Sequence, residues 1–236
     1  MKRHIPLLIF FFFPFPFLFS SCHHNDYTPK PTAYLRIDMP EHDYWLVDTL
    51  PVSDCGPDPA DVTLPFLFEA NQCAELTLKR PRLVETVEDY GVMNVIKPMR
   101  LKEGSFNEVW LDIKYPQWNG VVFLTYKRLK GSDDLRGQVD TSSRKLEQHY
   151  QFSSGVEEQG YEDRENKVYG TVYYLKGPRV ASTCQFWMTD STRHFLRGAL
   201  FLNTTPNNDS LAPVIDYIQA DIEHLVETLR WRGNSR

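Results

Sequence analysis

Cysteine and clustered basic charge are both scarce in this chain of 236 residues. The four cysteines include no Cys-x-x-Cys pair, which argues against a zinc ribbon or a thioredoxin-like site. Lysine and arginine number 26 against 31 acidic residues, and the densest basic run, residues 127–130, is followed by Asp133 and Asp134. A nucleic-acid surface needs clustered Lys and Arg, so no nucleic-acid partner is expected. We interpret the basic run as the end of a strand that enters a solvated turn.

The usual catalytic and cofactor motifs are also missing. The sequence has no glycine-rich phosphate loop, no His-Glu-x-x-His helix and no pair of carboxylates in an acid–base arrangement. His23 and His24 could bind a metal ion adventitiously, but a flexible segment without fixed geometry binds weakly. The sequence therefore predicts a protein that is not an enzyme and has no cofactor and no metal site.

A hydrophobic run long enough to cross a membrane is absent as well. Residues 5–19 are apolar but fall short of the ~20 residues that a spanning helix needs, and three of them are prolines. Lys2 and Arg3 precede the run, and Ser20 and Ser21 follow it directly before Cys22. This order is typical of a secretory signal and resembles a bacterial lipoprotein signal with Cys22 as the lipidated first residue. An ordinary cleaved signal with an incidental cysteine is the alternative.

These features predict how the chain is organised. Residues 1–21 are a signal peptide, 22–32 a lipidated tether, 33–232 a single domain and 233–236 a C-terminal tail. Two or more acyl chains on Cys22 would hold the protein stably at a membrane. Without Lys2 and Arg3, 24 basic residues remain against 31 acidic ones, a net charge of −7.

Three cysteines remain beyond the anchor. An exported compartment permits disulfides, and Cys55 and Cys73 flank one loop-and-strand unit, so they are the expected pair, with Cys184 left over. Closing this short loop would stabilise the fold by about 3 kcal/mol. The alternative is three free thiols, with Cys184 buried in a strand as a small apolar residue.

The secondary-structure pattern favours an α+β fold, an antiparallel sheet packed with helices. Segments rich in aromatic and β-branched residues predict strands at 33–39, 62–70, 74–80, 108–115, 121–129, 167–177, 181–191 and 194–204. Asn119-Gly120 predicts a tight hairpin turn, and the last three strands predict a meander. The strand groups are separated by a helix rather than alternating strictly with helices, which argues against a doubly wound parallel sheet.

Two helices are expected between and after the strands. The first is capped by Ser132 with Asp133 and ends near Gly155, and the acidic stretch 155–166 is expected to be an exposed loop. The last is long, is capped by Asp209 or Ser210, and has Pro213 in its first turn. Its apolar stripe at helical spacing comprises Leu211, Val214, Ile215, Ile218, Ile222, Leu225, Val226 and Leu229.

One polar cluster is a candidate functional site. Asp190, Ser191, Arg193, His194 and Arg197 lie close together in the sequence. A catalytic Ser191–His194 pair would need an acid from another element and usually a Gly-x-Ser-x-Gly elbow, which is missing. Strand alternation places Arg197 on the face opposite His194. Either Arg197 forms a structural salt bridge, with Asp190 as the candidate, or it binds a partner in a Trp- and Phe-rich patch.

A second function class uses aromatic side chains. Trp118, Tyr173 and Trp187 could stack on a small ligand or glycan, which would make the protein a periplasmic binding module. A concave apolar pocket with a few converging polar groups would support this alternative.

Several short runs of the C-terminal half form a recognisable set: Gln185-Phe186 to Thr189-Asp190-Ser191, "HFLRGALF", "PNNDSLAPV", and "DI" with "ETLRW". Together with "AYLRIDMP" and "LTYK", they resemble the GldD family of gliding motility lipoproteins of Bacteroidetes. The cysteine at position 22 agrees with it. The final strand, turn and helix also look like a Mog1/PsbP-type sandwich, a weaker analogy at the level of the fold.

The resemblance implies a non-enzymatic accessory protein of gliding and of the linked type IX secretion machinery. It implies contacts with lipoproteins such as GldB, GldH and GldJ, and it supplies no catalytic residues. An anchor in the outer membrane facing the periplasm is expected, because the residues after Cys22 carry too little acidic charge for a surface-export signal.

Overall fold

The structure is a computed structural model that describes residues 38–51, 61–79 and 107–233. The signal segment, Cys22, His23, His24 and Cys55 lie outside the described residues. The predictions made for them, including the lipid anchor and the Cys55–Cys73 bond, therefore stay predictions.

The described chain forms two antiparallel sheets and two α-helices. The larger sheet has seven strands in the order β3-β4-β5-β9-β8-β7-β6, and the smaller has the order β1-β2-β10. The strands are β1 Tyr44–Pro51, β2 Asp61–Asn71, β3 Glu75–Lys79, β4 Glu108–Tyr115, β5 Gly120–Arg128, β6 Gly155–Asp163, β7 Val168–Lys176, β8 Cys184–Thr189, β9 His194–Leu202 and β10 Arg230–Trp231. The helices are α1 Ser132–Glu147 and α2 Asn208–Thr228. The predicted α+β class is confirmed.

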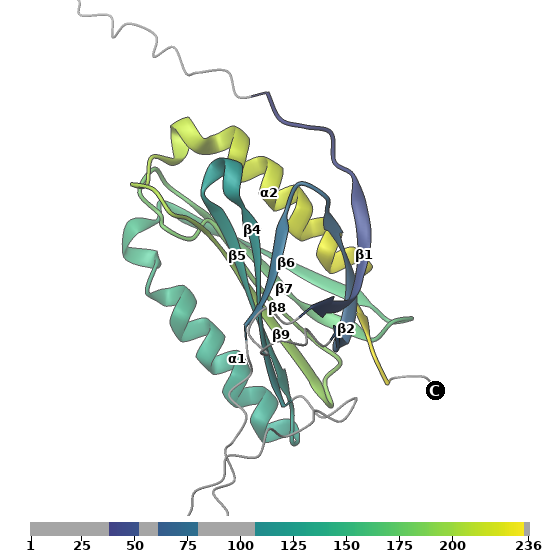
Figure 1. The fold of residues 1–236 in the computed structure, drawn as a ribbon. Coiled ribbons are helices and arrows are strands. Elements are labelled where there is room, and N and C mark those ends of the chain that lie inside the picture. Colours follow the sequence, from purple (N-terminus) through teal and green to yellow (C-terminus); the bar gives the residue numbers. More distant parts are fainter. Residues whose placement is uncertain (1–37, 52–60, 80–106, 234–236) are drawn as a thin grey trace, which may run out of the picture. The chain divides into compact units, whose positions relative to one another are not determined.

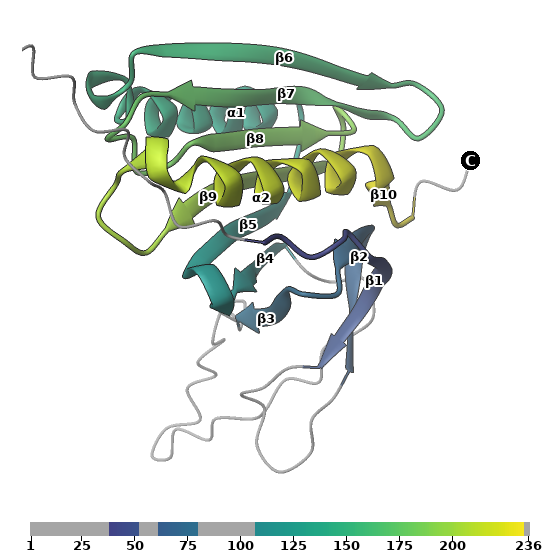
Figure 2. The same ribbon diagram turned by 90° about the horizontal axis from the view of Figure 1, so that it is seen from above.

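The helices lie on opposite sides of the larger sheet (Figure 1). α2 and the small sheet share one side, where β2 contacts α2 and their apolar side chains join one core. Figure 2 shows β1 and β2 beside the C-terminal half of α2. On the other side, α1 contacts β8 and β9. The described part of the chain therefore has three layers: α1, the seven-stranded sheet, and α2 with the small sheet.

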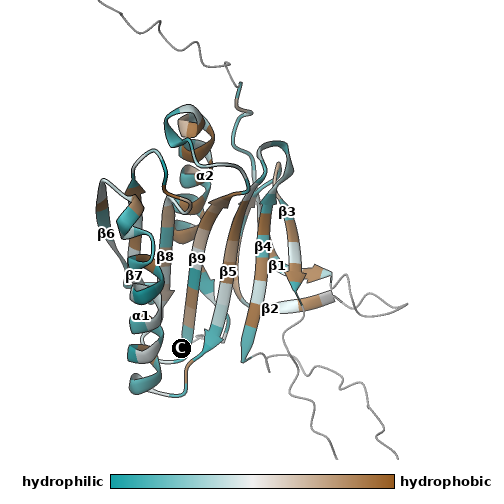
Figure 3. Ribbon diagram, turned by 90° about the vertical axis from the view of Figure 1, so that its left-hand side faces the viewer, coloured by the Kyte–Doolittle hydropathy of each residue, from teal (hydrophilic) through white to brown (hydrophobic). Residues whose placement is uncertain are grey.

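Strand alternation decides which residues enter the main core. Val122, Leu124 and Tyr126 of β5 are buried on the α2 side, as are Leu196 and Leu200 of β9 and Phe186 and Met188 of β8. The α2 stripe predicted from the sequence contributes Val214, Ile218, Ile222, Leu225 and Val226 to this core. Figure 3 shows the central strands coloured as apolar, whereas α1 is mostly hydrophilic. The smaller set under α1 comprises Leu146, Leu175 and Val180.

The predicted hairpin between β4 and β5 is confirmed, but only Asn119 of the two expected turn residues has a positive φ, because Gly120 is already the first residue of β5. A 3₁₀ turn, Pro116–Trp118, precedes Asn119, which adopts the left-handed conformation at φ 51°. Asn adopts this region more readily than most residues because its short polar side chain can form local hydrogen bonds. Tyr115 pairs with Gly120 across the turn.

Several boundaries differ from the sequence-based expectations. The acidic segment predicted as a loop is mostly strand β6, because a strand at the sheet edge needs backbone pairing with β7 but no apolar side chains. α1 ends at Glu147 rather than near Gly155. α2 begins at Asn208 after an Asn207 cap, which places Pro213 beyond the first turn. Of the strand predicted at 33–39, only residues 38 and 39 are described, and they are not in a strand.

Candidate functional site

Asp190 organises the turn between β8 and β9 through its carboxylate. Its Oδ1 accepts hydrogen bonds from the backbone N–H groups of Thr192, Arg193 and His194 at 2.9, 2.7 and 2.8 Å. Its Oδ2 accepts one from the Thr192 hydroxyl at 2.8 Å. Burial alone would raise the pKa of Asp190, but these hydrogen bonds outweigh burial and lower the pKa to about 2. The predicted polar turn is confirmed, and Asp190 holds it closed.

The remaining members of the predicted cluster do not form a catalytic arrangement in the described part of the chain. Ser191 is exposed at φ 64°, and no hydrogen bond joins it to His194. The His194 ring is buried on the α2 side, where Nδ1 lies 2.9 Å from the Tyr126 hydroxyl and the ring stacks on Trp231. Arg193 is exposed and donates to the carbonyl oxygen of Gly233 at 3.5 Å.

The Asp190→Asn variant is expected to lose stability in a pH-dependent way. Because the folded pKa lies below the ordinary carboxyl value of 3.8, the stabilising effect is complete above about pH 4 and disappears as the pH falls towards 2. We expect the variant to be about 1–2 kcal/mol less stable than wild type at pH 6, and the gap to narrow at pH 2.5. Urea unfolding at both pH values measures this, with exposed Asp216→Asn as the control. An equal gap at both pH values would contradict the prediction.

Arg197 lies on the α1 side of the sheet and does not pair with Asp190. Its Nη2 donates to the Gln185 side-chain oxygen at 2.7 Å, so the predicted Asp190 salt bridge is wrong. The reason is geometric: Asp190 turns its oxygens to the backbone of its own loop, while Arg197 points away from the α2-side core. Burial lowers the pKa of the Arg197 guanidinium, and no carboxylate within the described ranges pairs with it.

The surroundings of Arg197 are basic. Lys145 of α1 and Lys127 of β5 lie near it: the charges of both Arg197 and Lys127 lower the pKa of Lys145, although burial is the larger cause. Burial likewise lowers the pKa of His149, with a smaller contribution from Arg197. The nearby acid is Glu108, which accepts a hydrogen bond from Trp110 Nε1 at 2.9 Å and lies 4.0 Å from Lys127.

A second polar cluster, which the sequence did not reveal, surrounds Asp221 of α2. Asn71 donates to both carboxylate oxygens at 3.0 and 3.2 Å, Tyr44 donates to Oδ1 at 3.0 Å and Tyr115 donates to Oδ2 at 2.9 Å. The His42 ring nitrogen Nδ1 lies 2.7 Å from Oδ1. Burial and the Asp221 charge raise the pKa of Tyr44 and Tyr115, so both phenols remain protonated donors. We name these five residues the Asp221 cluster.

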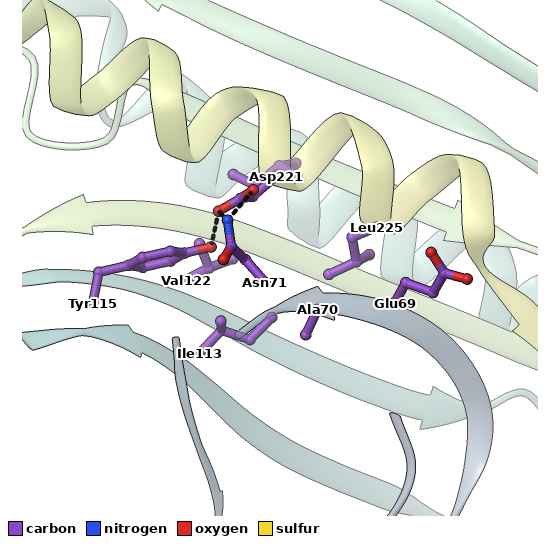
Figure 4. A pocket seen from close by; sticks show the side chains of 9 residues that line it. Glu69, Ala70, Asn71, Ile113, Tyr115, Val122, Asp221 and Leu225 are labelled. Carbon is purple, nitrogen blue, oxygen red and sulfur yellow. Dashed lines mark hydrogen bonds between the residues drawn. The ribbon is translucent and has the colours of Figure 1, made fainter. Parts of the chain in front are cut away.

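The cavity beside the Asp221 cluster is too small for a substrate. Figure 4 shows Asn71 and Tyr115 directed at Asp221, with Ile113, Val122 and Leu225 as apolar walls and Glu69 further along β2. The cavity measures about 10 Å³, which is at the lower limit for one water molecule. The cluster therefore joins β2, β4 and α2 structurally rather than forming a binding pocket.

The sequence carried one signal for the Asp221 cluster. Asp221 interrupts the apolar stripe of α2, with Ile218 before it and Ile222 and Leu225 after it. A carboxylate in a buried stripe must be hydrogen-bonded or paired, so partners were implied. Which residues supply them could not be read from the sequence, because the donors lie 106 to 179 residues away.

The three aromatic residues proposed for ligand stacking do not share a surface. Trp118 contacts Tyr115 and Tyr217 on the α2 side, whereas Trp187 stacks on Phe195 on the α1 side. Tyr173 packs beside the Leu146 set under α1. A groove of about 490 Å³ runs between β7 and α2, and its lining includes neither these aromatics nor another tryptophan, but several carboxylates. The structure therefore does not favour the ligand-binding alternative.

Three further findings concern membrane-spanning helices, metal-binding clusters and cysteines in the described residues. None of the helices within the described residues is both long and apolar enough to traverse a bilayer. In the same part of the chain, no group of three or more His, Cys, Asp or Glu residues gathers at a metal-binding distance. Cys184 is buried, and the Cys73 sulfur lies 3.7 Å from the Tyr217 hydroxyl.

Comparison with known proteins assigns the family. A family model described as "Gliding motility lipoprotein GldD" matches residues 24–231, which is most of the chain. Neither the search of curated proteins nor the search of solved structures found a match to the chain. The match spans β1 to β10, both helices, the Asp190 turn and the Asp221 cluster, so it covers nearly all of the described domain. The chain belongs to the GldD family of gliding motility lipoproteins.

Proposed function

We propose that this protein is a lipid-anchored, non-enzymatic accessory protein of gliding motility and type IX secretion that works by binding other envelope proteins. Membership of the family implies a membrane-anchored lipoprotein of the cell envelope with an accessory role in gliding. The link to secretion and the contact with lipoproteins such as GldB, GldH and GldJ are parts of the proposal.

The observation that carries the contact mechanism is an apolar surface on the α1 side of the sheet. We name it the α1-side patch and define it by Trp110, Phe123, Phe201 and Arg197. Phe123 is 37% exposed, and its ring packs at 5.7 Å from that of Phe201. Among the described residues α1 contacts β8 and β9, Phe123 of β5 is exposed beside the Lys79 ammonium, and Trp110 of β4 is half-buried. Aromatic and arginine side chains together are typical of binding hot spots.

The anchor completes the proposal. Acyl chains such as palmitate on Cys22 would fix the domain at the outer membrane, on its periplasmic side, where secretion and motility components are within reach. A Mog1/PsbP-type sandwich is our proposal for the finer class of the fold, supported by the layering of one large antiparallel sheet between helices.

Crosslinked envelopes provide the test. A tagged full-length protein is compared with Phe123→Asp, with Cys22→Ala, and with Leu46→Asp, a matched exposed apolar residue on β1. We expect wild type and Leu46→Asp to capture the same secretion and motility lipoproteins. Phe123→Asp should reduce this capture at least tenfold because it places a charge in the apolar contact.

Gliding speed and secretion of a reporter protein are measured in the same strains. We expect Phe123→Asp and Cys22→Ala to impair both, with the protein level of Phe123→Asp unchanged. Normal capture and secretion by Phe123→Asp would show that the α1-side patch is not the contact surface.

A further inference from the structure

Arg197 carries a positive charge that no carboxylate among the described residues neutralises. Its guanidinium has five N–H donors, and within the same ranges its Nη2 donates to a neutral acceptor, the Gln185 amide oxygen. Gln185 is only 3% exposed, and its own Nε2 has no hydrogen-bond partner within the described residues. Buried charges and buried amides are usually fully paired, so an incomplete arrangement of this kind needs a reason.

The neighbourhood adds positive charge instead of removing it. Lys127 and Lys145 lie near Arg197, while Glu108 already faces Trp110 and Lys127. Asp112, which pairs with Phe123 across β4 and β5, forms an ion pair with Lys79 at 2.7 Å. We name Lys127, Lys145 and Arg197 the basic patch. It stands out because the mature chain as a whole is expected to be acidic, with 24 basic and 31 acidic residues.

From these contacts we infer that the partner which binds the α1-side patch is a protein segment that presents an acidic side chain to Arg197. A carboxylate matches the planar guanidinium in two parallel hydrogen bonds and would supply the missing counter-ion. Lys127 and Lys145 would attract the same acidic segment over a longer range. This inference rests on the proposed function and specifies the chemistry of its partner.

A protein segment fits this surface better than a phosphate group does. Phe123 and Phe201 lie on the same side of the sheet as Arg197, and a lone phosphate or lipid headgroup would leave their rings in water. An acidic segment with apolar neighbours covers the charge and the rings together. An acidic domain is also repelled by an anionic lipid surface.

The first experiment uses the full-length protein in cells with a photo-crosslinking benzoylphenylalanine at position 123. The crosslinked partner peptide is sequenced by mass spectrometry, and we expect Asp or Glu within a few residues of the crosslink. Arg197→Glu should abolish the crosslink, and changing the partner's acidic residue to Arg should restore it in that background. Failure of this reciprocal exchange, with partner and protein both folded, would overturn the inference.

Variants that remove the positive charges of the basic patch test the acidic partner independently of the proposed function. We expect capture to fall at least tenfold in the Arg197→Met, Lys145→Met double variant and by less in Arg197→Lys, which keeps the charge but loses the two parallel hydrogen bonds. Raising the salt from 0.05 to 0.5 M should weaken capture by wild type but not the residual capture by the double variant. If Phe123→Asp abolishes capture while these charge changes and salt do not, the proposed function stands and the acidic partner is wrong. If Phe123→Asp has no effect, the proposed function fails.

A thermal melt and a competition assay distinguish partner binding from a structural role of Arg197 and from phosphate binding. A purely structural Arg197 would make Arg197→Met less stable, whereas loss of a partly buried, uncompensated charge should leave the thermal midpoint unchanged or higher. Inorganic phosphate at 10 mM and vesicles containing phosphatidylglycerol are tested as competitors of the crosslink. Displacement by either one, with loss of their binding in Arg197→Met, would assign the basic patch to phosphate or headgroups instead.

Discussion

Replacing Asp221 by alanine is expected to lower the free energy of unfolding by about 3–5 kcal/mol. The carboxylate accepts hydrogen bonds from Asn71 and Tyr115, each only 2% exposed, and both would lose a charged acceptor in an apolar surrounding. A buried donor without an acceptor costs about 1–3 kcal/mol. Tyr44 and His42 are less buried, so water can replace part of their contact.

Urea unfolding of the mature chain with Cys22→Ala, which removes the lipid, measures this loss. Tyr115→Phe deletes one donor and keeps the acceptor, so it should cost about 1 kcal/mol. Tyr174→Phe removes an exposed hydrogen bond to Glu223 and should cost less than about 0.5 kcal/mol. A loss below about 1 kcal/mol for Asp221→Ala would show that the Asp221 cluster is not a major source of stability.

The Asp221 cluster also fastens the start of the domain. His42 and Tyr44 reach α2 across 179 and 177 residues of sequence, and the Tyr44 ring stacks on His224 at 3.7 Å. These are early residues in the described chain. If Cys22 is anchored in a membrane, pulling forces on the tether would act at the segment that Asp221 holds.

Much of the fold could be predicted because its strands alternate strongly. β4 carries apolar residues at every second position on the α2 side, β5 does so from Val122 to Tyr126, and the α2 stripe repeats at helical spacing. The same alternation correctly predicts that Arg197 and His194 lie on opposite faces of β9. Local pattern was sufficient in each of these elements because one face is buried.

The strands that were missed lack a uniformly buried face. β6 is paired on one edge only and is exposed along most of its length, so its Glu and Gln residues resemble a loop in sequence. β1 has two exposed apolar residues, Trp45 and Leu46, and a register shift after Val47 that breaks its alternation. A bulge of this kind moves later residues to the other face, and sequence periodicity cannot detect it reliably.

The site was predictable only where its partners are close in sequence. The Asp190 turn involves residues within four positions of Asp190, and the polar pattern indicated a turn. The charge environment of Arg197 and the Asp221 cluster depend on tertiary contacts between distant elements. Neighbouring residues in sequence suggested Asp190 as the partner of Arg197, but opposite strand faces separate them.

Gly198→Ala is expected to destabilise the protein by about 3 kcal/mol, and by more if the neighbours cannot move. Gly198 pairs with Phe186 across β9 and β8, and a methyl group there would lie 2.1 and 2.2 Å from two atoms of the Phe186 ring. That ring is 1% exposed in the core, so it has little room to shift. The thermal midpoint should fall by roughly 6–12 °C.

A second substitution tests the cause. Phe186→Leu removes the colliding ring edge at a cost of its own, and in the Gly198→Ala background it should recover at least about 1 kcal/mol of the loss, which gives a non-additive double-mutant cycle. Gly137→Ala on α1 is the matched control: no atom lies within 4 Å of its new methyl group, and helix propensity favours alanine by about 0.5–1 kcal/mol. Additive effects of Gly198→Ala and Phe186→Leu would mean that the backbone of β9, rather than the Phe186 ring, sets the requirement for glycine.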